Sequence, residues 1–437
     1  MLKEKLKENI SNHWRARFAA LSLAGILSTM GLSQAYCADT FAIEGGKWFD
    51  GAEFKPATWF VDENGSLTKT RPKNIDHIIE VNGKFVVPPY GEGHNHNLQN
   101  PWAVKNFGPL QVSSGVFYSV QMCSFGEEVK AQFSSRDTMD VLFASDCITA
   151  SDGHPLGLIL NGKKEVTNDE LKNAQEMVLV ADSKEDLDQI WEKVKANHPS
   201  FIKIILVGSE KFEERHGDKK YLGINGLNPK LVPRIVERAH QSGIPVAAHV
   251  DTAHDAEVAI KAGVDVLGHL PGYRIAKNEG FDRQDYVLSD AVIAEAAKRG
   301  TKLIATANVP SKHYTKEEIS EIQANQRDNL RRLRKAGATI LMGSDNFSGT
   351  VLSEIRYLDA LGIAPREALL KSLTMDTPKW MYPGRHLGVF AEGAEGSFLV
   401  LEGNPLEDLG FLDQIHIGVK QGYLNTEIVS LQFGASL

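Results

Sequence analysis

The stretch LVPRIVERAHQSGIPVAAH (residues 231–249) places an amphipathic helical pattern, a glycine and an apolar strand in direct succession. Apolar residues recur three and four positions apart before the glycine, which is the spacing of a helix with one buried face. Gly243 stands where a helix commonly ends in a left-handed cap. The strand that follows ends in His249, so the stretch has the order expected of a helix–strand unit of a parallel sheet.

The same unit occurs three more times, in DAEVAIKAGVDVLGH (255–269), AVIAEAAKRGTKLIAT (291–306) and NLRRLRKAGATILMGSD (329–345). A polar or metal-binding residue follows each of the four strands; these are His249, His269, Thr306 and Asp345. The carboxyl ends of the strands of a closed barrel meet at one mouth, which is where such barrels carry their active sites. An open doubly wound sheet would instead use a glycine-rich phosphate loop, and the sequence has no convincing one. The pattern predicts an α/β fold, a (β/α)8 TIM barrel over residues 89–383.

Both ends of the chain have a different pattern of apolar and turn residues from the predicted barrel region. Residues 40–88 consist of short alternating segments separated by the hairpin-type turns ENG and VNGK, and residues 384–437 contain similar segments. The simplest packing joins the two ends in one small β-sandwich domain beside the barrel.

The first 35 residues have the composition of a secretory signal peptide. A basic start precedes the apolar run FAALSLAGILSTMGL (18–32), which is too short for a good membrane span, and small residues follow it. Cleavage after Ala35 or after Cys37 is consistent with the pattern. We therefore expect an exported protein, periplasmic or secreted, with no stable membrane span.

Composition and cysteine content narrow the class of protein further. The chain has 437 residues, 42% of them hydrophobic, 24% charged, and a formal net charge of -8. The composition is typical of a soluble globular protein, and the negative charge argues against a nucleic-acid partner. The partner expected from the function derived below is a small-molecule substrate. The oligomeric state stays open, with a homo-oligomer among the alternatives. Cys123 and Cys147 form either one disulfide bond or two buried thiols.

The first barrel strand is expected in KFVVPPYGEGHNHN (84–97), which turns polar at His94 and His96. Two histidines two residues apart on a strand point the same way and can reach one ion. Alone, this pair is as consistent with a solvated loop as with a metal site. Histidines and an aspartate at the ends of later strands favour the metal site.

Lys203 lies within the apolar strand FIKII (201–205). An unpaired ammonium group loses its hydration there and tends to become neutral. A neutral amine near two divalent cations can react with carbon dioxide to give a carbamate, an anionic bridge between the two ions. The alternative is a lysine whose side chain extends to water at the strand end.

In their order along the chain, several pieces resemble the amidohydrolase superfamily, in particular its imidazolonepropionase-like and secreted dipeptidase-like hydrolases. The pieces are VVPPYGEGHNHN (86–97), DGHPLG (152–157), FIKI (201–204), IPVAAH (244–249), VDVLGHLPG (264–272), MGSD (342–345) and GSFLVLEGNPLEDL (396–409). The resemblance covers nearly all of the chain after residue 35. Glu92 departs from the aspartate that is usual in the first motif, and Asn95 and Asn97 are unusually polar and could change the substrate pocket.

The resemblance implies a role for each matched residue. His94 and His96 would bind the more buried of two divalent metal ions with Asp345, and His249 and His269 would bind the second. Carboxylated Lys203 would bridge the two ions. Asp345 would also be the catalytic residue that orients water and accepts its proton. Zinc fits these ligands best, although manganese, cobalt and iron also suit them.

Other polar residues near predicted strand ends are candidates for substrate contact. His154, in DGHPLG, is the first of them, and the others are Tyr118, Tyr273, Asn308 and Asn346.

The function that follows is hydrolysis of an amide-type C–N bond by metal-activated hydroxide, in a dipeptide, an N-acyl amino acid or a cyclic amide. A lactonase or esterase could use the same site, and the sequence does not separate the two. A deaminase is disfavoured, because relatives of that type use one metal and lack the bridging lysine. A secreted binding protein on an inactive barrel is the alternative of a different class.

Overall fold

The computed structural model describes residues 38–426 and 428, apart from 124–126, 134, 164, 275, 277–278 and 309–313. The predicted signal peptide and both predicted cleavage sites lie outside the described residues. Across the part of the chain that is described, every helix is too short or too polar to cross a membrane.

Eight parallel strands line the predicted barrel. They are β6 (Tyr90–Glu92), β7 (Val116–Gln121), β8 (Asp140–Phe143), β11 (Ile202–Ile205), β12 (Val246–His249), β13 (Val266–Leu267), β14 (Lys302–Ile304) and β15 (Ile340–Leu341). Strands β6, β7 and β8 form one hydrogen-bonded group, and β11 to β15 form another together with β9 (Ile148–Thr149) and β10 (Leu179–Val180).

Two seams close these groups into a barrel. At the first seam, Ala144 just after β8 bridges Phe201 just before β11. At the second, the Gly93 amide donates to the Met342 carbonyl at 2.9 Å, and the Asp345 amide donates to the His94 carbonyl at 2.8 Å. The (β/α)8 fold is therefore confirmed. The first and last strands meet at the residues that carry the predicted metal ligands.

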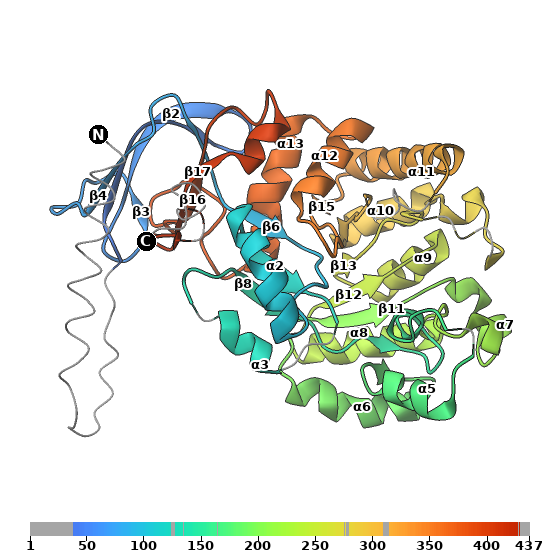
Figure 1. The fold of residues 1–437 in the computed structure, drawn as a ribbon. Helices are drawn as coiled ribbons and strands as arrows, with labels where there is room; N and C mark the ends of the chain where they lie inside the picture. Colours follow the sequence, from blue (N-terminus) through green and yellow to red (C-terminus); the bar gives the residue numbers. More distant parts are fainter. Residues whose placement is uncertain are drawn as a thin grey trace, which may run out of the picture.

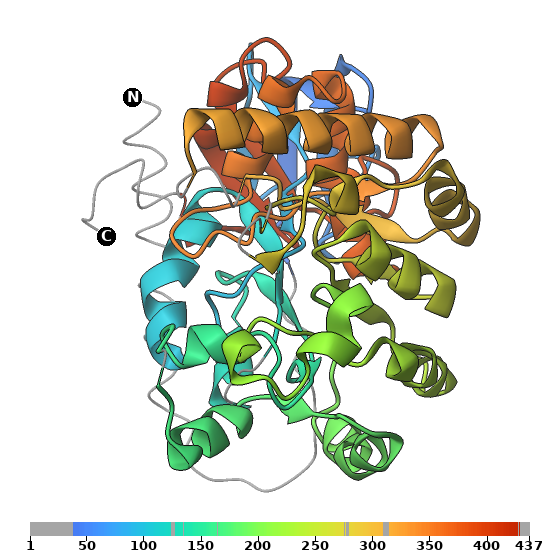
Figure 2. The same ribbon diagram turned by 90° about the vertical axis from the view of Figure 1, so that its right-hand side faces the viewer.

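The helices that follow the strands lie around the outside of the barrel (Figure 2). They include α2 (Pro101–Ser113), α6 (Lys184–Ala196), α8 (Val232–Gln241), α9 (Ala253–Ala262), α10 (Asp290–Arg299), α11 (Lys316–Lys335), α12 (Leu352–Leu361), α13 (Arg366–Lys371) and α14 (Thr377–Met381). The remaining helices are α3 (Glu127–Lys130), α4 (Leu156–Ile159), α5 (Asn168–Gln175) and α7 (Phe212–Arg215).

The ends of α9 show why the sequence forms these helices where it does. Thr252 accepts a hydrogen bond from the Asp255 amide, and the Asp255 carboxylate reaches back to the Thr252 amide, which is a capping box. Gly263 ends the helix at φ 92°, in the left-handed region that glycine adopts without strain. The predicted role of the glycines as helix stops is thus confirmed here.

The two ends of the chain form one eight-stranded sheet. Its strands are β1 (Phe41–Phe49), β2 (Phe54–Val61), β3 (Leu67–Thr68), β4 (His77–Glu80), β5 (Phe85–Val87), β16 (Phe398–Leu401), β17 (Ile415–Lys420) and β18 (Tyr423–Leu424). β5 pairs with β16, so the N-terminal and C-terminal segments share one hydrogen-bond ladder. The sheet has its own core, which includes Trp48, Trp59 and Phe398. Figure 1 shows it at one end of the molecule, with blue strands beside red ones.

The turn VNGK does not form the predicted hairpin. The strands on either side of it, β4 and β5, both pair with β1, and both are parallel to it. The glycine turn therefore moves the chain along one strand instead of reversing it against its neighbour.

Paired charges join the small sheet to the barrel. Lys420 on β17 is 1% exposed, and its amine donates to Asp140 Oδ1 on β8 at 2.5 Å. Arg385 donates to the other Asp140 oxygen at 2.7 Å and to Glu395 at 2.6 Å. Buried charges persist in a folded protein when they are paired in this way. These pairs fix the sheet against the barrel.

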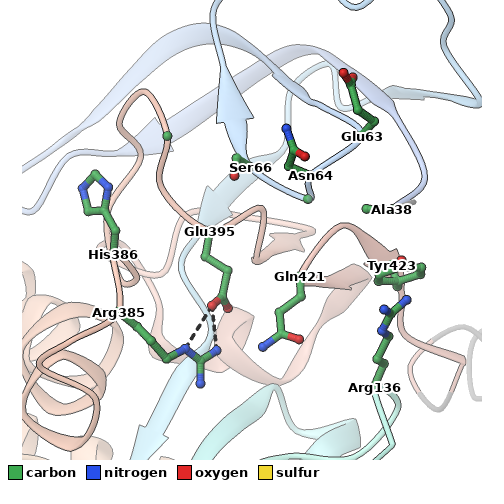
Figure 3. A pocket seen from close by; sticks show the side chains of 12 residues that line it. Ala38, Glu63, Asn64, Ser66, Arg136, Arg385, His386, Glu395, Gln421 and Tyr423 are labelled. Carbon is green, nitrogen blue, oxygen red and sulfur yellow. Dashed lines mark hydrogen bonds and ion pairs between the residues drawn. The ribbon is translucent and has the colours of Figure 1, made fainter. Parts of the chain in front are cut away.

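A cavity of about 610 Å³ lies near this junction (Figure 3). It is lined by Ala38, Glu63, Asn64, Gly65, Ser66, Arg136, Arg385, His386, Gly393, Glu395, Gln421 and Tyr423. None of the predicted metal ligands is among them. Arg385 is paired with Glu395, and Arg136 lies 3.7 Å from the centre of the Tyr423 ring. These pairs hold the junction together.

The structure joins Cys123 and Cys147 in a disulfide bond, with Cα atoms 4.9 Å apart and 24 residues of separation. We expect Cys123→Ser to lower the free energy of unfolding by about 3 kcal/mol, because the unfolded chain regains the entropy of an open loop. Urea denaturation without reductant measures this. Dithiothreitol should shift the wild-type curve by the same amount and leave the variant unchanged. Equal stability of both proteins without reductant would contradict the structural role.

Candidate metal centre

Lys203 projects into the barrel interior. It pairs in register with Ala247, and Ile205 pairs with His249, so Lys203 and His249 lie on the same face of neighbouring strands. The Lys203 side chain is buried, with 1% of the residue exposed, and its amine has no hydrogen-bond partner among the described residues. A Cβ atom at position 268 would lie only 2.8 Å from the amine nitrogen. Gly268 therefore leaves the room that the lysine occupies.

Three residues from the first and last strands converge beside this amine. The Nε2 atoms of His94 and His96 are 3.3 Å apart, and they lie 4.0 and 3.8 Å from Asp345 Oδ1. Donor atoms of His94, His269 and Asp345 all lie within 4.8 Å of one another. Predicted ligands that are far apart in the sequence thus share one small volume.

Glu92 fixes the two loops that present these ligands. Its buried carboxylate accepts hydrogen bonds from the His94 amide at 3.1 Å and from the amide and hydroxyl of Ser344 at 2.8 and 2.7 Å. Asp345 is the residue after Ser344, and its φ is 49°. This is a left-handed conformation that aspartate tolerates better than most residues. The glutamate found in place of the usual aspartate therefore connects the first strand to the last.

His249 and His269 each use one ring nitrogen outside the cluster. His249 Nε2 lies 3.1 Å from Asp251 Oδ1, and His269 Nδ1 lies 2.6 Å from Thr306 Oγ1. A partner on one ring nitrogen sets the tautomer and leaves the other for a metal. The two rings are 4.2 Å apart between centroids. Nδ1 of His249 and Nε2 of His269 are thereby left available as metal ligands.

Burial and mutual repulsion keep the histidines neutral. Burial lowers the pKa of His94 and of His269 well below the ordinary value, and neighbouring charges, Lys203 among them, lower it further. The same causes lower the pKa of His96 to about 3. Burial lowers the pKa of Lys203 to about 8 against the attraction of Asp345, and burial raises the pKa of Asp345 to about 7. A neutral imidazole keeps one N–H and offers the lone pair of its other nitrogen, which is the form that a metal site requires.

The residues present fit a divalent cation. Lys203 Nζ and Asp345 Oδ1, beside the Nε2 atoms of His94 and His96, are buried without a hydrogen-bond partner among the described residues, a rare condition for polar atoms in a folded protein. Nitrogen and carboxylate oxygen are the donors that zinc and similar ions prefer. A cation between these atoms would satisfy the groups that the protein itself leaves unpaired.

Two of the predicted substrate residues lie beside the centre. The His154 ring is 4.9 Å from the His249 ring, and its backbone amide donates to the Asn225 carbonyl at 2.7 Å. The Tyr273 ring stacks on His269 with centroids 4.6 Å apart. Contact of either residue with substrate stays a prediction, which their positions support.

The prediction that Tyr118 contacts substrate is wrong. Its side chain is on the face of β7 that packs against the small sheet, where its hydroxyl donates to Glu395 at 2.9 Å. Successive residues of a strand point to opposite faces, and the sequence alone does not say which face is which. Tyr118 belongs to the junction of sheet and barrel.

The asparagine side chains near the centre form hydrogen bonds within and between loops. The Asn346 side chain bonds Ser348 and Ser353, so it shapes its own loop. Asn97 donates to the Asn346 carbonyl at 3.4 Å, and the Asn95 side chain accepts from the Asn97 amide at 2.7 Å. The expected change of the substrate pocket by Asn95 and Asn97 finds no support in these contacts. The Asn308 amide donates to Glu354 at 2.9 Å, which fixes the backbone there.

The sequence did not reveal which side chains hold the predicted metal ligands in place. Asp251 lies between His249 and Arg274, whose Nε donates to Asp251 Oδ2 at 3.1 Å. Burial alone would raise the pKa of Asp251, but Arg274 and His249 together lower it below its ordinary value. The position of Asp251, two residues after His249, could have indicated that it contacts this predicted ligand.

The sequence profile of the Amidohydrolase family matches residues 147–425, which is more than half of the chain. The chain belongs to the amidohydrolase family. This confirms the predicted superfamily. Ochratoxinase of Aspergillus niger is 29% identical over 189 residues, which cover 42% of this chain and 38% of that protein. The chain thus matches less than half the length of this relative.

Solved structures share the fold over most of the chain. A Xaa-Pro dipeptidase with bound methionine superposes with a TM-score of 0.67 at 19% identity, covering 88% of this chain and 99% of that one. The A. niger ochratoxinase structure gives 0.68 at 19% identity, covering 89% and 95%. A putative prolidase from Bifidobacterium longum gives 0.68 at 20% identity, with the same coverage. At these identities the likeness establishes the barrel with its small β domain.

Proposed function

We propose that this amidohydrolase is a binuclear metal-dependent enzyme that hydrolyses an amide C–N bond. The observation that carries the proposal is a cluster in which donor atoms of His94, His269 and Asp345 lie within 4.8 Å of one another. His96, His249 and the buried Lys203 amine lie beside it, and that amine has no hydrogen-bond partner among the described residues. Membership in the amidohydrolase family supports amide hydrolysis. The fold it shares with a dipeptidase and an ochratoxinase is consistent with that chemistry.

His94, His96 and Asp345 would hold one cation, and His249 and His269 the other. Lys203 would reach both as a carbamate. Its neutral amine forms an N–C bond to carbon dioxide and releases one proton, which leaves an anion with two oxygens. When bound, divalent cations lower the pKa of water and polarise a carbonyl group.

Asp345 handles the proton in the proposed reaction. Its Oδ1 lies among the metal-ligand atoms, 3.8 Å from His96 Nε2, so the proton would fall to the other carboxylate oxygen, Oδ2. It can therefore take a proton from water that attacks the substrate carbonyl carbon. As the C–N bond breaks, the same proton passes from Asp345 to the departing amine. His154 and Tyr273 border the place where the substrate lies.

A substrate panel tests the type of bond cleaved. The zinc-loaded protein should release amine from at least one dipeptide, N-acyl amino acid or cyclic amide. Ester and lactone analogues of the same compounds form the second arm. Turnover of esters and lactones alone would overturn amide hydrolysis and favour the lactonase or esterase alternative. No turnover in either arm, with metal bound, would favour a binding protein.

Asp251 offers a test of how the second cation is held. We expect Asp251→Asn to weaken metal binding by about 10–100-fold, because the amide loses the charge that pairs with Arg274 and orients His249. Chelator competition measures the affinity directly. Asp188→Asn is a matched control, since Asp188 on α6 is half exposed and pairs with Arg234 at 2.9 Å away from the centre. An affinity within twofold of wild type in Asp251→Asn would contradict this role.

We also propose that the mature enzyme works outside the cytoplasm. The disulfide bond between Cys123 and Cys147 supports this, because such bonds persist in oxidising compartments. Fractionation of expressing cells, with the N-terminus of the product sequenced, tests both export and the cleavage site. Recovery of uncleaved protein in the cytoplasm would oppose export.

A further inference from the structure

A disulfide bond links the two strand groups of the barrel. Cys123 follows β7, in the group whose first strand, β6, leads directly to His94 and His96. Cys147 directly precedes β9, in the group that supplies the other predicted histidine ligands. The bond therefore connects the two halves of the barrel that present the predicted metal ligands.

Cys147 is the firmly held end of this bond. It is fully buried, it packs with Ile205 and Val207, and its carbonyl accepts from the Leu179 amide at 2.9 Å. Cys123 is half-buried and lies at φ 56°, a left-handed conformation that is uncommon for residues other than glycine. Such a conformation persists only where surrounding contacts impose it. The disulfide bond is one of these contacts, and it anchors the turn after β7 on the larger sheet.

Gln121, the last residue of β7, joins the same turn to the loop of the first ligands. Its buried side-chain amide donates to the carbonyls of Met122 and Cys123 at 3.1 and 3.0 Å. Its side-chain oxygen accepts from the Leu98 amide at 2.9 Å. One side chain thus holds both the turn at Cys123 and the chain that follows His96.

Met122 lies between the disulfide bond and the first pair of histidines. Its amide donates to the carbonyl of Asn95, the residue between His94 and His96, at 2.8 Å. Burial lowers the pKa of His96, and a hydrogen bond between the His96 ring and the Met122 backbone acts against this. A partner outside the metal site orients the ring of a histidine ligand. Met122 therefore holds both the backbone beside His96 and the His96 ring.

We propose that the disulfide bond between Cys123 and Cys147 positions His96 as a metal ligand, acting through the turn at Met122. The proposal rests on the proposed function, because it takes His96 as a ligand. Loss of the bond would free the turn and let the His96 ring leave its place while the barrel stays folded. Both cysteines are therefore positioning residues of the metal centre, in addition to their contribution to stability.

Cys147→Ser tests the proposal, because it removes the bond and leaves every residue of the turn unchanged. In metal-free protein without reductant, hydrogen–deuterium exchange followed by mass spectrometry reports local opening. Segments 94–98 and 120–123 should exchange about tenfold faster than in wild type, and their gain should exceed that of α9. Chelator competition should show zinc binding weakened by about 10–100-fold, the range known for groups that orient a metal ligand.

Leu187→Ala is the matched control for lost stability. Leu187 is a fully buried residue of the outer helix α6, and its truncation destabilises a protein about as much as the loss of a disulfide bond. It should leave zinc affinity unchanged and should not favour exchange in either segment. Gln121→Met fills the same space without the three hydrogen bonds, and it should behave like Cys147→Ser. If one of these two variants does not fold, the other decides.

Unchanged exchange of both segments in Cys147→Ser would overturn the positioning role. So would unchanged zinc affinity in that variant, or an equal loss of affinity in Leu187→Ala. If wild type binds no zinc, the proposed function fails. Exchange in the metal-free protein still decides, in that case, whether the bond holds the segment that contains His96.

Discussion

Asp345→Asn should lower kcat by about 10³-fold, within the range ascribed to a positioned general base. Asparagine has the size of aspartate and keeps one oxygen that could coordinate a metal, but it cannot accept the proton of the attacking water. Because His94, His96, Lys203, His249 and His269 remain, we expect at least one metal ion to stay bound. Steady-state kinetics on the best amide of the panel, together with metal analysis, measures both quantities.

Asp290→Asn is the control for this variant, because its side chain is 96% exposed on α10. It should behave like wild type. Activity of Asp345→Asn within tenfold of wild type, with its metals bound, would show that another group takes the proton.

Lys203→Ala should lower kcat/KM by about 10³-fold or more, because the anion proposed to join the two cations is lost and hydroxide formation depends on both ions. Small carboxylic acids such as formate or propionate should restore part of the activity, since they can place two oxygens in the space that the side chain leaves. Kinetics with and without these acids measures the rescue.

Lys203→Met separates charge from packing. Methionine fills a similar volume with an apolar chain and cannot form a carbamate. Replacing a buried amine that has no hydrogen-bond partner among the described residues should not destabilise the metal-free fold. Without metal, thermal unfolding of the variant should therefore match wild type or exceed it. Full activity of Lys203→Met would refute the bridge and leave the lysine a packing role.

The fold could be predicted from the sequence because its decisive signals are local. Each helix–glycine–strand unit specifies a helix stop and a buried strand within about twenty residues, and parallel strands in succession leave few closed topologies. Gly263, at φ 92°, ends α9 as predicted. The predicted ligands follow from the same order, because strand ends of a barrel converge.

Other features depend on contacts between distant segments. The Tyr118 side chain could face either side of its strand, and the partner that decides this, Glu395, is 277 residues away. The turn VNGK has hairpin residues, but β1 pairs with the strands on both sides of it. The link between Asp251 and Arg274 spans 23 residues and a loop. Local patterns do not encode such pairings.

The central claim is that two metal ions share Lys203 as a bridge. Metal content per chain, measured for wild type and Lys203→Ala after supply of zinc and bicarbonate, tests it most directly. We predict two zinc ions per wild-type chain and one or none in the variant. The same metal content in both proteins, or no bound metal in wild type, would contradict it.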